Sequence, residues 1–320
     1  MLLDEDKLKE VSWALISDLY NKFRKHGFSE ANLLQIFGKE VVRYTNVSAK
    51  EKSLLRNHVM APHQDLAILI DAFLFREMVD RDDLIRLVGN DAVNHLVSLG
   101  FFLVKNDGLL PVISIAPVGD RYFLNDGLPA TKMLEFPVFP IFLEQFYLKK
   151  IMDHLLVGRP AIESAFELCS GSGVCGLSGP GQYSITGEDI NPRAVAYARF
   201  NAQANDFSDY KYLERDSSEI GYAGEKVDLF TCNPPYNAYI DNAPEAHEGF
   251  RLPAHCGPFG DKVTKRLFTV ADQILSDSGS AFFVATWLMK DGELAYPGVT
   301  ELCEKGSLLL FHTPIKPINT

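Results

Sequence analysis

One short run of residues, Asn233-Pro234-Pro235-Tyr236, has the side chains and carbonyls needed to hold a planar nitrogen. Such a nitrogen is a poor nucleophile because its lone pair is delocalised, so it must be oriented toward an electrophile. The Asn233 side-chain oxygen and the Pro234 carbonyl can accept its two N–H groups and stabilise the positive charge that develops on it. The prolines stiffen the turn and offer no N–H, and Tyr236 can stack on a flat group. A plain strand-ending turn is the alternative interpretation.

Two earlier segments have the pattern of a nucleoside-binding site. Residues 166–176 read Phe-Glu-Leu-Cys-Ser-Gly-Ser-Gly-Val-Cys-Gly, so glycines follow an apolar run that we predict to be a strand. Glycines at such a turn let the backbone and the next helix approach a ligand closely. Asp189 ends the next predicted strand, about 20 residues past the loop, where a carboxylate can bind ribose hydroxyls. The two segments together indicate a nucleoside-containing cofactor.

The three segments resemble the class I S-adenosylmethionine-dependent methyltransferases that carry an Asn-Pro-Pro-Tyr motif. The general likeness is to the HemK-like group, which includes release-factor glutamine methyltransferases, and related signatures serve adenine-N6 and guanine-N2 methyltransferases. The resemblance covers about residues 161–288 and includes Gly-Glu-Asp-Ile-Asn-Pro-Arg at 187–193 and Ala-Tyr-Ala-Arg-Phe-Asn at 196–201. It implies a methyltransferase (EC 2.1.1 class) that uses S-adenosyl-L-methionine, releases S-adenosyl-L-homocysteine and needs no metal.

The resemblance also implies a set of site residues. Asn233, Pro234, Pro235 and Tyr236 would hold the methyl acceptor. Ile190 would pack on adenine and Asp216 would accept its amino group, although a core isoleucine and a surface acid are the alternatives. In this chain Cys169 replaces the first glycine of the family's loop, which adds a side chain at a tight turn. The residues assigned to cofactor binding are Glu167, Cys169, Ser170, Gly171, Gly173, Asp189, Ile190, Asp216 and Asn233.

The elements that must position these residues alternate between strands and helices throughout the second half. This alternation of strands and helices is typical of a mostly parallel sheet. We therefore predict a doubly wound, Rossmann-like α/β methyltransferase fold for the second half. The expected strands are 161–168, 183–188, 211–214, 227–232, 280–286 and 307–312, and the expected helices are 142–156, 192–205 and 261–276.

The first half has the pattern of a smaller, mostly helical domain. Its expected helices are 4–26, 29–37, 64–79, 81–88 and 91–99, followed by a hairpin at 101–116 with the turn Asn106-Asp107-Gly108. Helices followed by a hairpin indicate a winged-helix-like unit. Helix 91–99 contains no Lys or Arg, which favours a scaffold or substrate lid over DNA binding. A proline-rich join places the domains at 1–140 and 141–320.

The charge of the chain bears on the methyl acceptor. The sequence has 31 Lys+Arg against 42 Asp+Glu, a net charge of -11, and most of the excess acid lies in the second half. Proteins that bind long nucleic acids through phosphates normally present a basic face. We therefore place a small-molecule or protein acceptor before a nucleic-acid base. A non-catalytic nucleoside-sensing regulator is a further alternative, which the Asn-Pro-Pro-Tyr motif disfavours.

The cysteines, the histidines and the apolar runs bear on disulfides, metal sites and membrane spans, and therefore on the cellular compartment. The five cysteines show no CxxC pairing and the eight histidines show no HExxH spacing, so neither a disulfide framework nor a metal site is expected. No apolar run approaches the roughly 18–20 residues of a membrane span. We expect a soluble, cytoplasmic protein whose oligomeric state the sequence leaves open.

Overall fold

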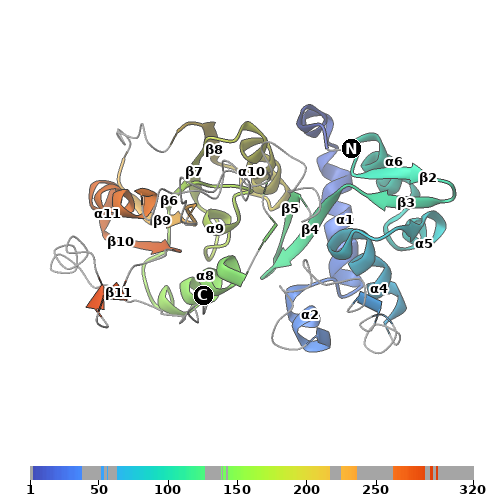
Figure 1. Ribbon diagram of the computed structural model, residues 1–320, viewed down its shortest axis with the longest axis horizontal. Helices are drawn as coiled ribbons and strands as arrows, with labels where there is room; N and C mark the ends of the chain where they lie inside the picture. The colour runs from blue at the N-terminus through green and yellow to red at the C-terminus, as the bar shows by residue number, and fades with distance from the viewer. Residues whose placement is uncertain are drawn as a thin grey trace.

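A computed structural model describes most of both halves of the chain, and Figure 1 shows a helix-rich N-terminal part beside an α/β part. The expected strand at 307–312 and Tyr236 lie outside the described residues. These residues are 3–37, 52–53, 56, 63–126, 138, 140–141, 143–216, 225–235, 262–284, 289–290 and 293–294.

The α/β part is built on a parallel five-stranded sheet in the order β10-β9-β6-β7-β8. The chain enters at the centre, moves outward through β7 and β8, and then continues on the other side through β9 and β10. This is the doubly wound fold expected from the sequence, and its switch point lies between β6 and β9. The strands are β6 (Ser164–Leu168), β7 (Ser184–Asp189), β8 (Tyr210–Glu214), β9 (Val227–Cys232) and β10 (Leu275–Phe283).

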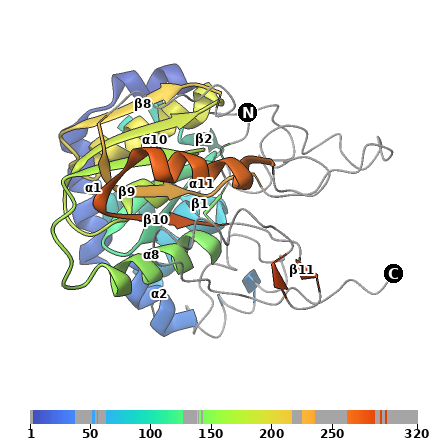
Figure 2. The same ribbon diagram turned by 90° about the vertical axis from the view of Figure 1, so that its left-hand side faces the viewer.

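Helices cover both faces of this sheet because successive strand residues point to opposite sides. Phe166 and Phe230 pack with α11 (Lys262–Ile274) on one face, and Figure 2 shows α11 lying along β9 and β10. Ala165 and Leu229 point to the other face and belong to a larger cluster. That cluster includes residues of α8 (Leu143–Leu155), α9 (Val174–Leu177) and α10 (Pro192–Ala204).

The N-terminal part has the topology of a winged helix. Its antiparallel sheet has the order β1-β3-β2, and two helices lie between β1 and β2 in the chain. Its strands are β1 (Val79–Asp80), β2 (Phe102–Lys105) and β3 (Gly108–Pro111). Its helices are η1 (Glu5–Glu10), α1 (Trp13–Lys25), α2 (Glu30–Phe37), α4 (Gln64–Ile70), η4 (Asp71–Phe75), α5 (Arg81–Val88) and α6 (Asn90–Ser98).

Two of the expected helices differ from the structure. The expected helix 4–26 divides into η1 and α1, because the backbone at Ser12 leaves the helix and its N–H donates to His95 Nε2 at 2.8 Å. The expected helix 64–79 becomes π-helical from Asp71 and ends at Arg76, whose φ of 54° is left-handed. Asn94 of α6 accepts a hydrogen bond from Arg81 at 2.7 Å. Asn94 and His95 therefore bind within the protein, which is consistent with the expectation that this helix serves a scaffold or lid rather than DNA binding.

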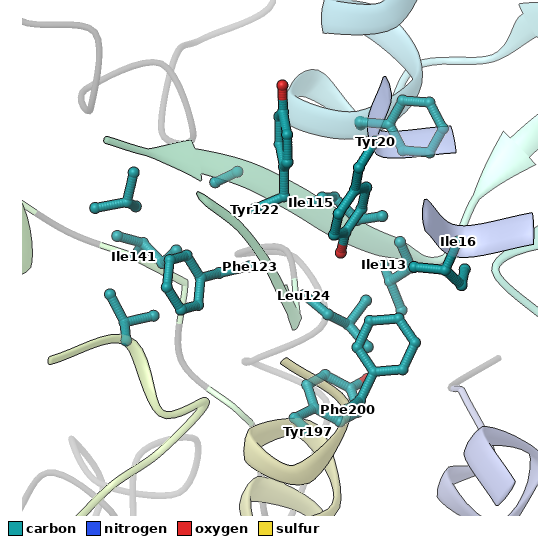
Figure 3. Close-up of a cluster of buried hydrophobic side chains, with 14 of the residues drawn as sticks. Ile16, Tyr20, Ile113, Ile115, Tyr122, Phe123, Leu124, Ile141, Tyr197 and Phe200 are labelled. Atoms are coloured by element: carbon teal, nitrogen blue, oxygen red, sulfur yellow. The ribbon is translucent and has the colours of Figure 1, made fainter. Parts of the chain in front are cut away.

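A second hairpin, which the sequence did not predict, joins the two parts. The expected strand 109–116 breaks at Val112, and the chain continues as β4 (Ile113–Val118) and β5 (Arg121–Asp126). Figure 3 shows Ile16 and Tyr20 of α1 on one side of this hairpin and Tyr197 and Phe200 of α10 on another. One buried cluster therefore runs through both parts, and the domain boundary near residue 140 stays a prediction. A short pair, β11 (Met289–Lys290) and β12 (Glu293–Leu294), completes the described elements.

Candidate cofactor and acceptor site

The fold brings the glycine-rich loop and the Asn-Pro-Pro segment side by side. Leu168, the last residue of β6, pairs with Cys232, the last residue of β9. Cys169 and Asn233 are the next residues in the two chains, so both loops leave the sheet at the same edge. This edge lies at the switch point, where doubly wound domains bind their ligands.

The glycine-rich loop contains one open glycine and one closely packed glycine. Gly171 has φ 54°, and a Cβ added there would meet nothing within 4 Å, so a ligand has room to approach its backbone. Gly173 has φ 82°, and a Cβ there would lie 3.0 Å from the Tyr212 hydroxyl and 3.3 Å from the Ala198 Cβ. The structure therefore gives Gly171 space for a ligand and gives Gly173 a role in packing.

Cys169 adopts the left-handed conformation that glycine would adopt more easily. Its φ is 52°, a region that non-glycine residues enter rarely and at a steric cost. The loop nonetheless closes in an ordinary way, because Ser170 N–H donates to the Glu188 carbonyl at 3.0 Å and Gly173 N–H donates to the Ser170 carbonyl at 2.8 Å. The cysteine thus fits the glycine-type backbone without preventing the turn.

Asp189 lies at the end of β7 and binds the open part of the loop. Its carboxylate accepts the Gly171 N–H at 2.7 Å and the Asn191 N–H at 2.9 Å. Burial raises the pKa of Asp189, while these two N–H groups act in the opposite direction. The Ile190 N–H also acts on this carboxylate. Because a carboxylate has about four lone-pair sites, it still has room for a ligand hydroxyl. Ile190 beside it is 57% exposed and offers an apolar surface at the same edge.

Asp216 follows β8, the strand next to β7. Arg215 N–H continues the ladder by donating to the Asp189 carbonyl at 2.9 Å, so Asp216 lies one residue beyond this contact. Asp189, Ile190 and Asp216 therefore come from the ends of two neighbouring strands, as a site assembled along one sheet edge requires.

Glu167 lies beneath the loop. Its side chain is 1% exposed, and Oε1 accepts the Gly176 N–H at 2.9 Å. Burial is the main cause that raises the pKa of Glu167 to about 8. In this position the carboxyl group holds the residues that follow the loop.

Asn233 presents an unused acceptor at the start of the second loop. Its Oδ1 is buried and has no hydrogen-bond partner among the described residues, and Pro234 beside it is buried. A buried polar atom without a partner is uncommon in folded proteins and calls for an explanation. Ser170 Oγ in the neighbouring loop is a second such atom. Several other buried polar atoms among the described residues also have no partner, and the Asn233 and Ser170 atoms are distinguished by belonging to the two loops that leave the sheet at the same edge.

The sequence interpretation missed two residues that support the loop. Asn201 of α10 donates to the Ser172 carbonyl at 2.8 Å. Arg121 of β5 donates to the carbonyls of Leu177 and Gly179, just after the loop. Arg193, Tyr197 and Asn201 recur at every fourth position of α10, and this spacing could have indicated a polar face that binds within the protein.

Metal clusters and membrane-spanning helices are both absent from the described residues. No group of three or more His, Cys, Asp or Glu side chains is placed there to hold a metal. No helix in the described part of the chain is long and apolar enough to span a membrane.

The fold is a Rossmann-like, doubly wound α/β domain with a glycine-rich loop at its switch point. Over 124 residues, 37% of this chain and 40% of the relative, the chain is 30% identical to the ribosomal protein uL3 glutamine methyltransferase of Francisella tularensis. Over 102 residues, 29% of this chain and 30% of the relative, it is 33% identical to the ribosomal RNA large subunit methyltransferase F of Pseudomonas fluorescens. Both relatives support the methyltransferase interpretation.

These similarities are partial. The chain matches well under half the length of the curated relatives, and no protein-family model matches it. Among solved structures, a SAM-dependent methyltransferase from Agrobacterium tumefaciens aligns at a TM-score of 0.39 and 14% identity, covering 61% of this chain and 58% of that one.

Proposed function

We propose that this protein is an S-adenosylmethionine-dependent methyltransferase that transfers a methyl group to a planar amide or amino nitrogen. The observation that carries the proposal is the buried Asn233 Oδ1, which has no described partner and directly follows β9 beside the glycine-rich loop. The relatives named as methyltransferases of ribosomal protein and ribosomal RNA support the same reaction class.

In the proposed mechanism, the chain acts mainly by positioning. S-adenosylmethionine, when bound, supplies an electrophilic methyl group on its sulfonium. Asn233 Oδ1 and the Pro234 carbonyl accept the two N–H groups of the acceptor nitrogen and hold its lone pair toward that methyl group. These acceptors bind the nitrogen more strongly as it becomes positive, so they stabilise the transition state more than the ground state. The methylated nitrogen then releases one N–H proton to water. Tyr236 is proposed to stack on the flat acceptor.

The glycine-rich loop and the ends of β7 and β8 provide the groups that S-adenosylmethionine would need. The open backbone at Gly171 lets a ligand approach, and the Asp189 carboxylate next to it can accept ribose hydroxyls. The exposed Ile190 side chain can pack on adenine, and Asp216 is proposed to accept the adenine amino group. Cys169 and Ser170 contribute the backbone of the same turn, while Glu167 and Gly173 support it from below.

We infer that the acceptor is a glutamine-like side-chain amide of a protein. The relative matched over 124 residues is named as a glutamine methyltransferase, and a net charge of -11 is unfavourable for phosphate-rich partners. A ribosomal RNA base is the second candidate, because the other relative is named for ribosomal RNA. A small-molecule acceptor has no relative among these matches to support it.

Two measurements test the proposal in order. Isothermal titration with S-adenosylmethionine and S-adenosylhomocysteine should show binding that Asp189→Ala weakens strongly. Labelled methyl groups should then appear in the protein fraction of ribosomal extracts rather than in the RNA, and Asn233→Ala should retain cofactor binding but lose about 10²–10³-fold in turnover. A folded wild-type protein that binds neither compound would refute the proposal. Full activity of Asn233→Ala would refute the proposed role of Asn233 in holding the nitrogen of the methyl acceptor.

A further inference from the structure

Helix α10 and strand β5 are joined by a regular ladder of side-chain hydrogen bonds. Four helical residues advance about 6 Å along the axis, and two strand residues advance roughly 6.7 Å. Residues spaced by four on α10 therefore stay in step with residues spaced by two on β5. Asn205, the C-cap of α10, binds Tyr122, and Asn201 binds Leu124. Arg193 and Tyr197 both bind the carboxylate of Asp126.

Asn201 and Asn205 satisfy the backbone hydrogen-bonding groups on the outer edge of β5. Its inner edge pairs with β4, so alternate backbone groups point away from the hairpin, and buried ones need partners. Asn205 accepts the Tyr122 N–H at 3.0 Å and donates to the Tyr122 carbonyl at 2.9 Å. Asn201 does the same at Leu124, at 2.7 and 3.0 Å. Each amide thus replaces one residue of a neighbouring strand.

Asn201 differs from Asn205 in one further contact. Its second N–H donates to the Ser172 carbonyl at 2.8 Å, in the glycine-rich loop, and the side chain is 0% exposed. The remaining N–H of Asn205 bonds instead to the Asn201 carbonyl within its own helix. Asn201 alone of these two side chains therefore touches both β5 and the loop.

The held carbonyl lies at a position where the backbone needs support. Ser172 stands between Gly171 and Gly173, both of which have positive φ. Glycine backbones rotate more freely than others, so the Asn201 bond adds a second restraint to the peptide group of Ser172 and Gly173, whose N–H donates to the Ser170 carbonyl. The Asn201 hydrogen bond fixes this segment relative to β5, and β5 belongs to the hairpin that packs on the N-terminal helix α1 (Figure 3).

We propose that Asn201 is a positioning residue that ties the glycine-rich loop to strand β5 and thereby sets the affinity of the loop for its cofactor. The inference rests on the proposed function, because it assumes that the loop binds S-adenosylmethionine. It assigns the N-terminal part a role in holding the cofactor loop, in addition to any contact with the acceptor.

Asn205→Ala is the matched control for Asn201→Ala. Both variants remove one side-chain clamp from β5, so both should lower the melting temperature by similar amounts. Asn201→Ala also removes the bond to Ser172 and should weaken S-adenosylhomocysteine binding about fivefold in calorimetry. Asn205→Ala should leave the dissociation constant within twofold of wild type. Equal changes in affinity for the two variants, or no change in either, would overturn the inference.

Hydrogen exchange separates this inference from the proposed function, because it needs no cofactor. The Gly173 N–H, which bonds to the Ser170 carbonyl, should exchange faster in Asn201→Ala than in Asn205→Ala. Faster exchange without any cofactor binding in the wild type would refute the methyltransferase proposal and keep only the structural tie between the loop and β5. Unchanged exchange would refute the positioning role. Should Asn201→Ala fail to fold, Asn201→Gln keeps a buried amide but displaces it by one methylene from Ser172.

Discussion

Cys169 holds a backbone conformation that glycine adopts without steric cost. At its φ of 52°, a Cβ costs roughly 1–2 kcal/mol, whereas at ordinary positions alanine is more stable than glycine by roughly 0.5–1 kcal/mol. We therefore predict that Cys169→Gly is more stable than Cys169→Ala by about 1 kcal/mol in denaturant unfolding. Ala31→Gly, in the exposed part of α2, should show the opposite sign. Greater stability of the alanine variant at position 169 would contradict the left-handed conformation.

At the same scale, the sequence predicted which site residues lie close together better than it predicted the contacts that each side chain makes. Asp189 and Gly171 meet as the motif spacing predicted, because parallel strands place their loops at one edge. Glu167 belongs to the same motif, yet its carboxyl binds a backbone N–H beneath the loop. Spacing alone cannot reveal this difference, since alternate residues of one strand point to opposite faces. The role of Asn233 stays a prediction.

At the scale of elements, the contact between β5 and α10 includes a buried ion pair. Asp126 accepts hydrogen bonds from Arg193 at 2.8 and 3.2 Å and from the Tyr197 hydroxyl at 2.9 Å, and its side chain is 1% exposed. Asp126→Asn removes the buried charge that compensates the Arg193 guanidinium and leaves it only the partly exposed Glu5 carboxylate at 3.2 Å. We expect it to lower the free energy of unfolding by about 3 kcal/mol or more.

A surface pair provides the control for this prediction. Asp65 pairs with Arg86 at 2.8 Å, but both side chains are about half exposed. Asp65→Asn should therefore cost about 1 kcal/mol or less. Urea unfolding of both variants at the same ionic strength makes the comparison. Similar costs at the two positions would mean that Asp126 is not buried against Arg193 in solution.

Elements whose ends are set by local signals were predicted well, and those set by distant contacts were not. Helix α5 begins after its cap Asp80, whose side chain accepts the Asp83 N–H, and the expected range 81–88 is confirmed. Strand β5 was missed because its outer edge is satisfied by Asn201 and Asn205, which lie 77 and 83 residues further along the chain. The residues near β5 in the sequence contain no pattern that predicts these partners.

At the scale of the whole molecule, the two parts share one apolar interior. The largest buried cluster contains Phe23 of α1 and Leu124 of β5 as well as Tyr197 of α10. Trp13 of α1 contacts Phe200 of α10, with ring centroids 5.5 Å apart. Unfolding either part alone would expose this interior to water, at a cost that scales with the apolar area. The structure therefore favours strong coupling between the parts, although the sequence pattern suggested two domains.

We therefore predict that the chain unfolds in one cooperative transition even though its 320 residues exceed the size at which this is usual. Trp287→Phe leaves Trp13 as the sole tryptophan, so its fluorescence reports on the contact between α1 and α10. The midpoint of this fluorescence change should coincide with that of the far-ultraviolet circular dichroism, and calorimetry should show a single peak. Two separated transitions, with Trp13 following only the first, would instead establish independently stable domains. Such a result would also weaken the positioning role of Asn201, because the loop could then remain ordered after β5 has unfolded.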